Sequence, residues 1–227
     1  MQKTFIVIAA YNEERSISDV VHGLKKEGYH GRNIIVVDDG SNDNTFKEAQ
    51  KAGATVLKHA INRGQGAALR TGMDYSLKHK AEIIVHFDAD GQHNPKEVKD
   101  IIQPIINKEA DVALGSRFLS KKSDVPLIKR IVLKMGVVFT FIFSGIWLTD
   151  THNGFRAFSR KAAENIEITQ DKMEHASEII DLIKLKNIKY REIPVTIKYT
   201  KHSMEKGQSP LNSIRIAARL IWTKFLR

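Results

Sequence analysis

The chain has 227 residues, 42% of them hydrophobic, which is enough for one large domain with a sizeable core and excludes disorder throughout. It contains no cysteine, which excludes disulfides, thiolate zinc sites and cysteine nucleophiles and fits a reducing cytosol. The formal net charge of +10 favours phosphorylated ligands or an anionic lipid surface as partners. We expect no nucleic-acid partner, because the sequence shows neither a nucleic-acid-binding motif nor a basic patch interleaved with aromatic residues.

The first 115 residues alternate between apolar runs typical of buried strands and amphipathic segments typical of helices. We expect strands at residues 4–9, 33–38, 55–58, 82–87 and 111–114, and helices at residues 14–27, 45–52, 67–78 and 95–107. This alternation predicts an α/β fold with a mostly parallel sheet and helices on both of its faces.

The pattern changes beyond Arg117. Residues 131–148 form an apolar run of eighteen residues with a single charge, Lys134, and this length just reaches the range of a transmembrane helix. Small and hydroxylated residues dilute the run, so we expect a buried or interfacial helix instead. Three further elements complete the predicted domain: a strand at 154–159, a helix at 171–186 and an extended segment at 190–199.

The C-terminal region has the pattern of a basic amphipathic helix. Residues 211–227 place apolar side chains beside several arginines and a lysine. We therefore expect two units, an α/β domain at residues 1–200 that includes apolar interfacial helices at 125–148, and a basic tail at 201–227.

Two aspartates directly follow the fourth predicted strand. Asp88 and Asp90 are separated by one residue, and a turn at Gly91 brings them together with Gln92. Hard oxygen ligands suit Mg²⁺ or Mn²⁺, and the carboxyl end of a strand is where open α/β sheets bind ligands. The alternative is a polar strand-to-helix loop in which Asn94 caps the next helix.

The first two strands also end in polar turns. The segment Ala10-Tyr11-Asn12-Glu13 follows the first strand, and Asp38-Asp39 begins a polar run after the second. Because the carboxyl ends of parallel strands meet at one edge of a sheet, these turns converge with the two aspartates of the fourth strand. Helix capping explains one acidic turn, whereas three converging turns indicate a binding site.

In this combination and order the motifs resemble the inverting glycosyltransferases of family 2, which have the GT-A fold. The chain is most similar to the branch of dolichol-phosphate mannose synthase and the polyprenyl-phosphate glycosyltransferases, and the similarity runs through residues 4–200. The resemblance implies metal-dependent transfer of a sugar from GDP-mannose or a UDP-hexose to a dolichyl or undecaprenyl phosphate, with inversion. Such an acceptor is already anionic near neutral pH, so its reaction needs no catalytic base to remove a hydroxyl proton.

The resemblance assigns most of the polar strand ends to the donor nucleotide. Asp39 is expected to accept a hydrogen bond from a base N–H, because an ionised carboxylate only accepts. Asp88, Asp90 and Gln92 are expected to hold Mg²⁺ or Mn²⁺, which neutralises charge on the leaving diphosphate. The residues implied for the nucleotide are Ala10, Tyr11, Asn12, Glu13, Asp38, Asp39, Arg63, Gly64, Asp88, Ala89 and Asp90.

A glycine-containing turn leads into the helix expected at 67–78. It is not a dinucleotide fingerprint, because Leu69 stands where a third glycine is required. Two interpretations stay open: the glycines serve tight packing, or the loop and Arg63 lie beside the donor, as the resemblance implies.

The resemblance places further residues on the acceptor side. Arg117 and Arg130 match arginines that bind the lipid phosphate, for which the planar guanidinium fork is suited. His152 is implied near the same phosphate, although a lone loop histidine is more often structural. Arg117 joins Asp88 and Asp90 as the residues implied to be central to catalysis.

Two alternative functions and a location complete the expectations. A family 2 enzyme that glycosylates a saccharide hydroxyl of a cell-surface polysaccharide would need a carboxylate base near its acceptor. A non-catalytic nucleotide-binding module is less compatible with the intact Asp-Ala-Asp. We expect a peripheral protein on the cytoplasmic face of a membrane, held by the apolar segment and the basic tail, with a homo-oligomer or a membrane-protein partner left open.

Overall fold

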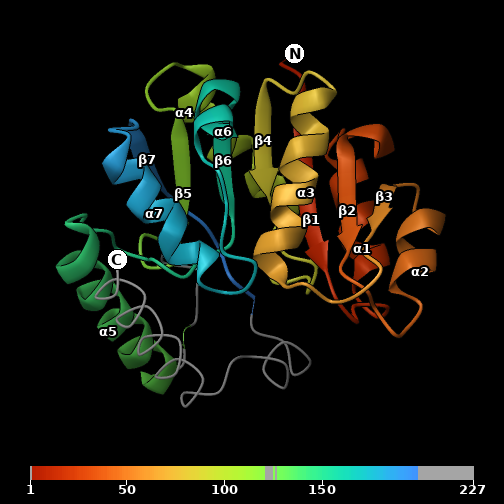
Figure 1. Ribbon diagram of the computed structural model, residues 1–227, viewed down its shortest axis with the longest axis horizontal. Coiled ribbons are helices and arrows are strands. Elements are labelled where there is room, and N and C mark those ends of the chain that lie inside the picture. The colour runs from red at the N-terminus through yellow and green to blue at the C-terminus, as the bar shows by residue number, and fades with distance from the viewer. Residues whose placement is uncertain (1, 121–124, 126, 199–227) are drawn as a thin grey trace.

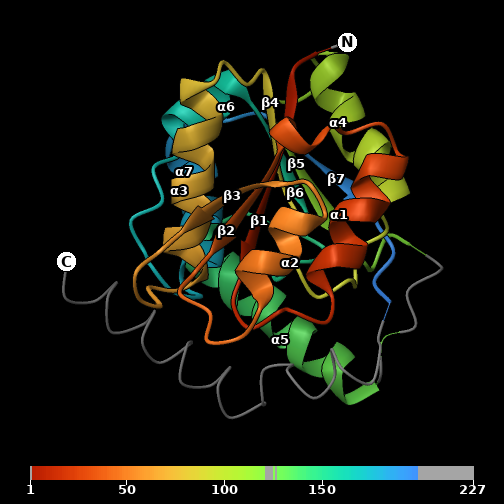
Figure 2. The same cartoon turned by 90° about the vertical axis from the view of Figure 1, so that its right-hand side faces the viewer.

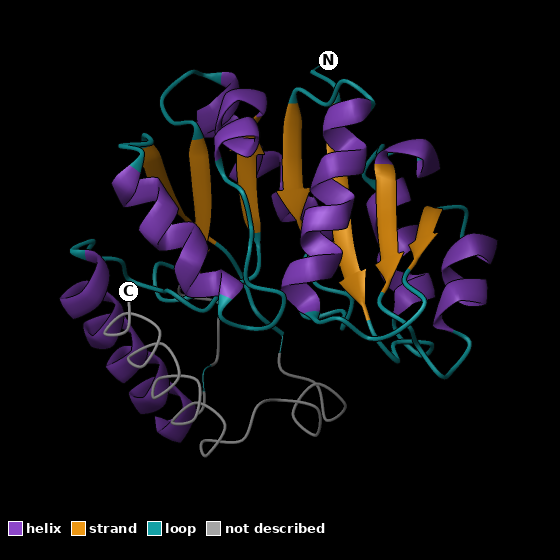
Figure 3. Cartoon of the chain, in the orientation of Figure 1, coloured by secondary structure: helices purple, strands orange, loops and turns teal. Residues whose placement is uncertain are grey.

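The computed structural model describes residues 2–120, 125 and 127–198, so the basic tail expected at 201–227 lies outside the described residues. The described chain forms a seven-stranded sheet flanked by helices (Figures 1 and 3). The strands are β1 (Thr4–Ala10), β2 (Ile34–Asp38), β3 (Thr55–Lys58), β4 (Ile83–His86), β5 (Val112–Ser116), β6 (Arg156–Ser159) and β7 (Tyr190–Pro194). The helices are α1 (Ile17–Lys26), α2 (Thr45–Lys51), α3 (Gln65–Lys78), α4 (Val98–Ile106), α5 (Leu127–Ser144), α6 (Arg160–Asn165) and α7 (His175–Leu185).

The strand order is β3-β2-β1-β4-β6-β5-β7. Strand β1 pairs in parallel with β2 and with β4, and β5 pairs in parallel with β7, whereas β6 runs antiparallel to both of its neighbours. The predicted α/β fold with a mostly parallel sheet is confirmed. In the β1–β2 register Ala10 lies opposite Asp38, so the turns that follow these two strands begin side by side.

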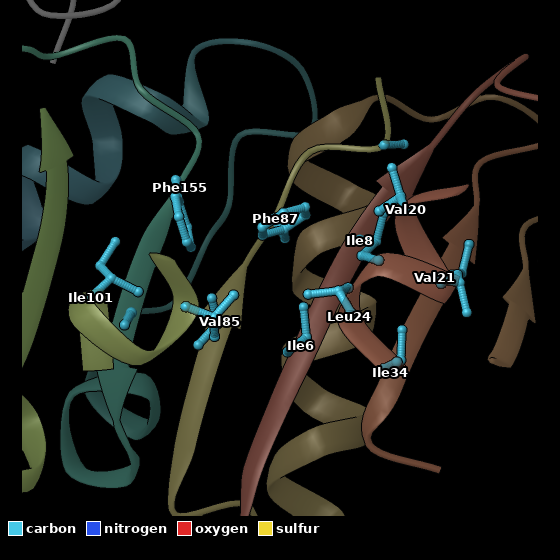
Figure 4. Packing of buried hydrophobic residues seen from close by; sticks show 14 of the residues in the cluster. Ile6, Ile8, Val20, Val21, Leu24, Ile34, Val85, Phe87, Ile101 and Phe155 are labelled. Atoms are coloured by element: carbon cyan, nitrogen blue, oxygen red, sulfur yellow. The ribbon is translucent and has the colours of Figure 1, made fainter. Parts of the chain in front are cut away.

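Alternating strand residues enter two hydrophobic cores, one on each face of the sheet. Ile6 and Ile8 of β1 pack with α1, α2 and α4 in one core, and Figure 4 shows Val20, Val21 and Leu24 of α1 beside them. Phe5 and Val7 of β1 pack with α3, α6 and α7 in the other core. Strands buried on both faces read as continuous apolar runs, which is why the sequence predicts them well.

The boundaries of several elements differ from the expectations. The apolar helix α5 begins at Leu127 instead of residue 131 and ends at Ser144 instead of residue 148, because Gly145 adopts a left-handed φ of 69°. The helix expected at 171–186 begins at His175. The helix expected at 95–107 is a 3₁₀ turn, Pro95–Glu97, followed by α4, and the six-residue α6 was not predicted.

Helix α5 lies beyond the carboxyl ends of the strands, away from the two cores (Figures 1 and 2). The exposed apolar side chains of α5 include Ile131, Met135, Val138, Phe141 and Ile142. No helix among the described residues combines the length and the hydrophobicity that crossing a bilayer requires.

We predict that Gly72→Ala destabilises the fold, because α3 approaches β1 too closely for a side chain there. A Cβ at Gly72 would lie 2.2 Å from Cγ1 of Val7. Overpacking of this kind lowers the free energy of unfolding by about 1–3 kcal/mol, although alanine favours the helix. Urea unfolding measures the loss, with Asp74→Ala on the exposed face of α3 as a control expected within about 0.5 kcal/mol of wild type. A fully stable Gly72→Ala variant would contradict the prediction.

Candidate active site at the carboxyl edge of the sheet

The turns after β1 and β2 are joined by hydrogen bonds. Asn12 has a left-handed φ of 55°, and its Oδ1 accepts a hydrogen bond from the backbone N–H of Asn42 at 2.9 Å. The backbone N–H of Asn12 donates to Ser41 Oγ at 3.0 Å, and that of Glu13 donates to Thr45 Oγ1 at 2.7 Å. The two turns predicted to bind the nucleotide therefore form one polar surface.

Asp39 holds a third segment, the loop before α3, against this surface. Its Oδ1 accepts hydrogen bonds from the backbone N–H of Arg63 at 3.0 Å and from His59 Nδ1 at 2.7 Å. Its Oδ2 accepts one from the backbone N–H of Gly64 at 2.7 Å. Asp39 is buried, as is Asp38 before it. The predicted contact with a nucleotide base stays a prediction, and the carboxylate already organises the loop.

The glycines of that loop are required by packing. A Cβ at Gly64 would lie 2.4 Å from the carbonyl oxygen of Asp171, and a Cβ at Gly66 would lie 2.0 Å from that of Gln170. Arg63 reaches the same segment, since its Nη2 lies 3.6 Å from a carboxylate oxygen of Asp171. Of the two interpretations of this turn, tight packing explains the glycines. The contact of Arg63 with the donor stays a prediction.

Asp88 and Asp90 occupy the loop after β4, and the predicted turn at Gly91 is present with φ 74°. Asp90 Oδ1 accepts a hydrogen bond from the backbone N–H of Gln92 at 3.0 Å. Gln65, in the first turn of α3, points its Nε2 at Asp88 Oδ1 from 3.4 Å. The loop of the two aspartates thus meets the beginning of α3, beside the loop that Asp39 holds.

The two carboxylates have opposite pKa shifts. Burial, the charge of Asp88 and, more weakly, that of Glu13 raise the pKa of Asp90 to about 6, although its hydrogen bond from Gln92 acts in the opposite direction. Burial also acts to raise the pKa of Asp88, but the nearby His93, Arg117 and Arg156 outweigh it and lower that pKa. The raised pKa of Asp90 shows that carboxylates lie close to each other in a partly desolvated site.

The residues at this loop fit a divalent cation. Two carboxylates with closely spaced charge provide the hard oxygen atoms that Mg²⁺ and Mn²⁺ prefer, and a cation would relieve the repulsion that raises the pKa of Asp90. No group of three or more histidine, aspartate or glutamate side chains forms a complete ligand set within the described ranges. A bound cation would therefore need further oxygen atoms, such as those of a diphosphate.

Arg117 follows β5 and is buried against Asp150. Its Nε donates to Asp150 Oδ2 at 2.6 Å and its Nη2 donates to the carbonyl oxygen of His152 at 3.2 Å. The Asp150 segment is fixed in turn by Glu192 of β7, whose Oε1 accepts hydrogen bonds from the backbone N–H and the hydroxyl of Thr149 at 2.8 and 2.7 Å. These hydrogen bonds fix the guanidinium group of Arg117 at the edge of the sheet.

The other two residues predicted on the acceptor side are more accessible. His152 is exposed, and its ring lies against α5 at Gly136, where a Cβ would come within 2.3 Å of it. Arg130 lies exposed in the first turn of α5. The structure thus joins Arg117 and His152 directly and places Arg130 on a separate element. Their roles toward a phosphate stay predictions.

A layer of buried basic residues lies beneath the acidic loop. Arg156 is 4% exposed, and burial lowers its pKa to about 10 although Asp88 and Asp150 act to raise it. Burial and the charge of Arg156 lower the pKa of His86 well below its usual value. Burial and Arg156 also lower the pKa of His175 to about 4, although its hydrogen bond to Lys172 opposes this. Arg156 thus remains the cation of this layer near neutral pH, and both histidines are neutral.

The Glycosyl transferase family 2 profile matches residues 5–167, which include the turns after β1, β2, β4 and β5. The chain belongs to glycosyl transferase family 2. This glycosyltransferase is 35% identical to the UDP-N-acetylglucosamine–dolichyl-phosphate N-acetylglucosaminyltransferase of Methanococcus voltae, over 97% of the chain and 95% of the relative. It is 42% identical to an uncharacterized protein of Methanocaldococcus jannaschii, over 97% and 91%. It is 27% identical to the polyprenol monophosphomannose synthase of Mycolicibacterium smegmatis, over 95% and 84%.

Solved structures confirm the predicted GT-A type of fold. Glucosyl-3-phosphoglycerate synthase from Mycobacterium tuberculosis, in complex with Mn²⁺, UDP and phosphoglyceric acid, matches with a TM-score of 0.74 at 18% identity. The match covers 97% of this chain and 76% of that chain. The resemblance to family 2 is thus confirmed, and the names of the polyprenyl-phosphate relatives agree with the expected branch.

Several residues of this candidate site were not predicted from the sequence. His59 and His93 each contact a site aspartate, and Asp150 pairs with Arg117. Gly154 leaves room for Asp88, because a Cβ there would lie 2.5 Å from its Oδ1. The sequence offers one partial signal, since Asp150 and Gly154 lie within two residues of His152, which the resemblance places on the acceptor side. The histidine contacts depend on loop geometry that no local pattern encodes.

We predict that His175 weakens the fold in mild acid. Its pKa of about 4 in the folded protein lies below 6.5, so the unfolded chain binds the extra proton between these values. The free energy of unfolding therefore falls as the pH falls, by about 2 kcal/mol from this residue between pH 6.5 and 5. Urea unfolding at pH 7 and 5 should show a smaller pH-dependent loss for His175→Asn, which keeps a donor for the Lys172 carbonyl. Equal losses in the two proteins would contradict the prediction.

Proposed function

We propose that this glycosyltransferase transfers a sugar from a nucleoside-diphosphate sugar to a polyprenyl phosphate with inversion at the anomeric carbon. The observation that carries the proposal is the Asp88–Asp90 pair, which lies where the polar turns after β1 and β2 and the loop before α3 converge. The 35% identical relative from Methanococcus voltae, covered almost entirely, has a name that specifies a dolichyl-phosphate acceptor and a UDP-N-acetylglucosamine donor. UDP-N-acetylglucosamine is therefore the first donor to test.

The proposal places the nucleoside over the joined turns of β1 and β2. The backbone and side chains of residues 10–13 line this surface, and Asp38 and Asp39 close it from the β2 side. The loop of Arg63 and Gly64, which Asp39 holds, completes the surface next to Gln65 and Asp88. The diphosphate then lies toward the two aspartates. A bare diphosphate there would be repelled, so this geometry is suited to a donor that arrives with a cation.

Asp88 and Asp90, with Gln92 beside them, would hold Mg²⁺ or Mn²⁺ in this proposal. The cation supplies Lewis-acid stabilisation of the charge on the departing nucleoside diphosphate. The side chains themselves restrict where the diphosphate lies, because the loop is closed by the Gly91 turn and by the Gln92 hydrogen bond. The sugar is then oriented with its anomeric carbon toward the acceptor side.

The acceptor is proposed to approach from the side of Arg117 and Arg130. An acceptor phosphate oxygen forms the new bond to the anomeric carbon as the bond to the nucleoside diphosphate breaks on the opposite side, which inverts the configuration. Arg117 and the buried Arg156 supply fixed positive charge behind this approach. No group is needed to remove a proton, because a phosphate monoester is anionic at neutral pH.

A membrane surface is the proposed source of this acceptor. Ile131, Met135, Val138 and Ile142 follow each other at intervals of four, three and four residues, so they form one apolar stripe on α5, and all of them are exposed. Arg130 and Lys134 lie exposed on the same helix. Apolar burial together with basic residues is typical of helices that lie in the membrane interface. Helix α5, which carries the stripe, lies beyond the carboxyl edge of the parallel strands (Figure 2), where a lipid phosphate would meet the site.

We predict that Asp90→Asn lowers sugar transfer about 100-fold or more, as expected for the loss of a group that serves to stabilise transition-state charge. The assay follows labelled sugar from UDP-N-acetylglucosamine to a short polyprenyl phosphate with Mn²⁺ or Mg²⁺. Asp74→Ala, on the exposed face of α3, is the control and should keep full activity. Full transfer by Asp90→Asn, or by wild type in excess chelator, would refute the metal-dependent mechanism. Transfer to a saccharide hydroxyl alone would refute the acceptor.

We predict that Arg130→Gln raises the KM for polyprenyl phosphate about tenfold, since hydrogen bonds to charged groups contribute about 1.5–3 kcal/mol. The KM for the donor should stay unchanged. Lys134→Gln removes the same charge from the exposed surface of the same helix and controls for a general effect of charge. For Arg117 the variant to use is Arg117→Lys, because a neutral side chain at position 117 would leave the buried carboxylate of Asp150 without its cation. If the donor KM rises for Arg130→Gln, the arginine serves the diphosphate instead.

We predict that the apolar stripe of α5 binds lipid bilayers. Met135 and Ile142 are 67% and 68% exposed, so a Met135→Glu, Ile142→Glu double variant should fold normally. Wild type should co-sediment with anionic vesicles, less so in high salt, and the double variant should remain in the supernatant. Leu185→Glu, at an 80% exposed position of α7, is the matched control and should bind like wild type. Wild type that stays in the supernatant would contradict the membrane proposal.

A further inference from the structure

His93 lies buried directly behind Asp88. Its side chain is 1% exposed, and its Nε2 lies 2.7 Å from Asp88 Oδ2. The ring is enclosed by aromatic side chains, with ring centroids 5.3 Å from Phe87 and 5.0 Å from Phe155. Among the described residues, the ring makes its polar contact with the carboxylate of Asp88.

The surroundings of the two ring nitrogens of His93 indicate which of them carries the proton. Nδ1 of His93 is buried and has no hydrogen-bond partner in the described part of the chain. An unpaired buried N–H is rarer in proteins than an unpaired lone pair. Asp88 is an ionised acceptor on the other side of the ring, so the proton belongs on Nε2, from which it donates to Oδ2.

The carboxylate of Asp88 is therefore held on several sides. His93 engages Oδ2, whereas Oδ1 faces Gln65 at 3.4 Å. The backbone at Gly154 abuts the same carboxylate, since a Cβ there would lie 2.5 and 2.7 Å from its two oxygens. The backbone of His93 is also anchored, because it forms a β-bridge with Ile197. The ring is thus a rigid donor that sets the rotation of the carboxylate about its Cβ–Cγ bond.

We propose that His93 is a positioning residue for the cation site: its Nε2–H holds Oδ2 of Asp88 and thereby turns Oδ1 toward the divalent cation of the donor complex. The inference rests on the proposed function, because it takes Asp88 as a metal ligand. Hydrogen-bonded partners of metal ligands commonly change metal affinity about 10–100-fold when they are replaced. His93 belongs to this class through geometry, since its ring contacts Oδ2 of Asp88 from the buried side of the loop.

Two variants separate the hydrogen bond from the shape of the ring. His93→Leu keeps an apolar group of moderate size in the aromatic enclosure and removes the donor. His93→Gln reaches similarly far and offers an amide N–H to Asp88 Oδ2. The measurement is Mn²⁺ binding in the presence of UDP, followed by electron paramagnetic resonance of free Mn²⁺, with thermal unfolding to show that each variant folds. Asp88→Asn shows that the signal reports this site.

We expect the dissociation constant for Mn²⁺ to rise about tenfold or more in His93→Leu and to stay within about threefold of wild type in His93→Gln. Wild-type affinity in a folded His93→Leu would overturn the inference. Equally weak binding by both folded variants would also overturn it, because the ring shape and not its N–H would then matter. A wild-type chain that binds no Mn²⁺ with UDP would instead refute the proposed metal site, and this inference with it.

Discussion

Strand β1 pairs in parallel with β2 on one side and β4 on the other, and this pairing brings the site together. Each of the three strands is buried on both faces, so a shift of register by one residue would exchange the two hydrophobic cores. The core thereby determines which residues end each strand. The polar residues that follow these strands, among them Asn12, Asp38 and Asp88, therefore lie at one edge because the apolar residues before them fix the register.

Carboxylates hold the loops that extend from this edge. Asp39 binds the loop before α3, and Glu178 of α7 accepts hydrogen bonds from the backbone N–H groups of Thr169 and Gln170. Glu192 holds the segment that carries Asp150. An ionised carboxylate accepts several backbone N–H groups at once, which suits it to fixing irregular loops near a site. Much of the acidic character around the site is therefore structural, and the Asp88–Asp90 pair stands apart from it.

The charge distribution at the edge is asymmetric. The acidic loop faces the turns proposed for the nucleotide, whereas Arg117 and Arg156 are buried beside and beneath it. His93 and, after it, these two arginines lower the pKa of Asp88 against the effect of burial, whereas burial and the charge of Asp88 raise the pKa of Asp90. Such an asymmetric site is suited to holding two negatively charged groups apart, the departing diphosphate on one side and the arriving phosphate on the other. Helix α5 lies beyond the same edge (Figure 1), so the proposed lipid acceptor and the proposed donor would meet at one end of the sheet.

The sequence by itself determined the α/β class, the strand ends and the acidic motif, because buried strands and the turns that follow them are local patterns. Apolar runs predicted β1, β2 and β4 within a residue or two, and the resemblance of the motifs to family 2 is confirmed. The end of α5 was predicted less well, since the helix ends where Gly145 takes a left-handed conformation and not where hydrophobicity ends.

Only the tertiary structure decided which partners each polar residue has. Asp39 and Arg117 were expected to face ligands, and the structure shows that each also holds a loop, with His59 and Asp150 as partners more than fifteen residues away in sequence. The reason that Gly64 must be glycine lies at Asp171, and the partner of Asp88 is the buried His93. The contacts of Asp39, Arg117 and Gly64 join segments that approach each other only after the sheet has formed, whereas the contact of His93 with Asp88 depends on how their shared loop folds. In both cases the local sequence carries the residue types but not the pairing.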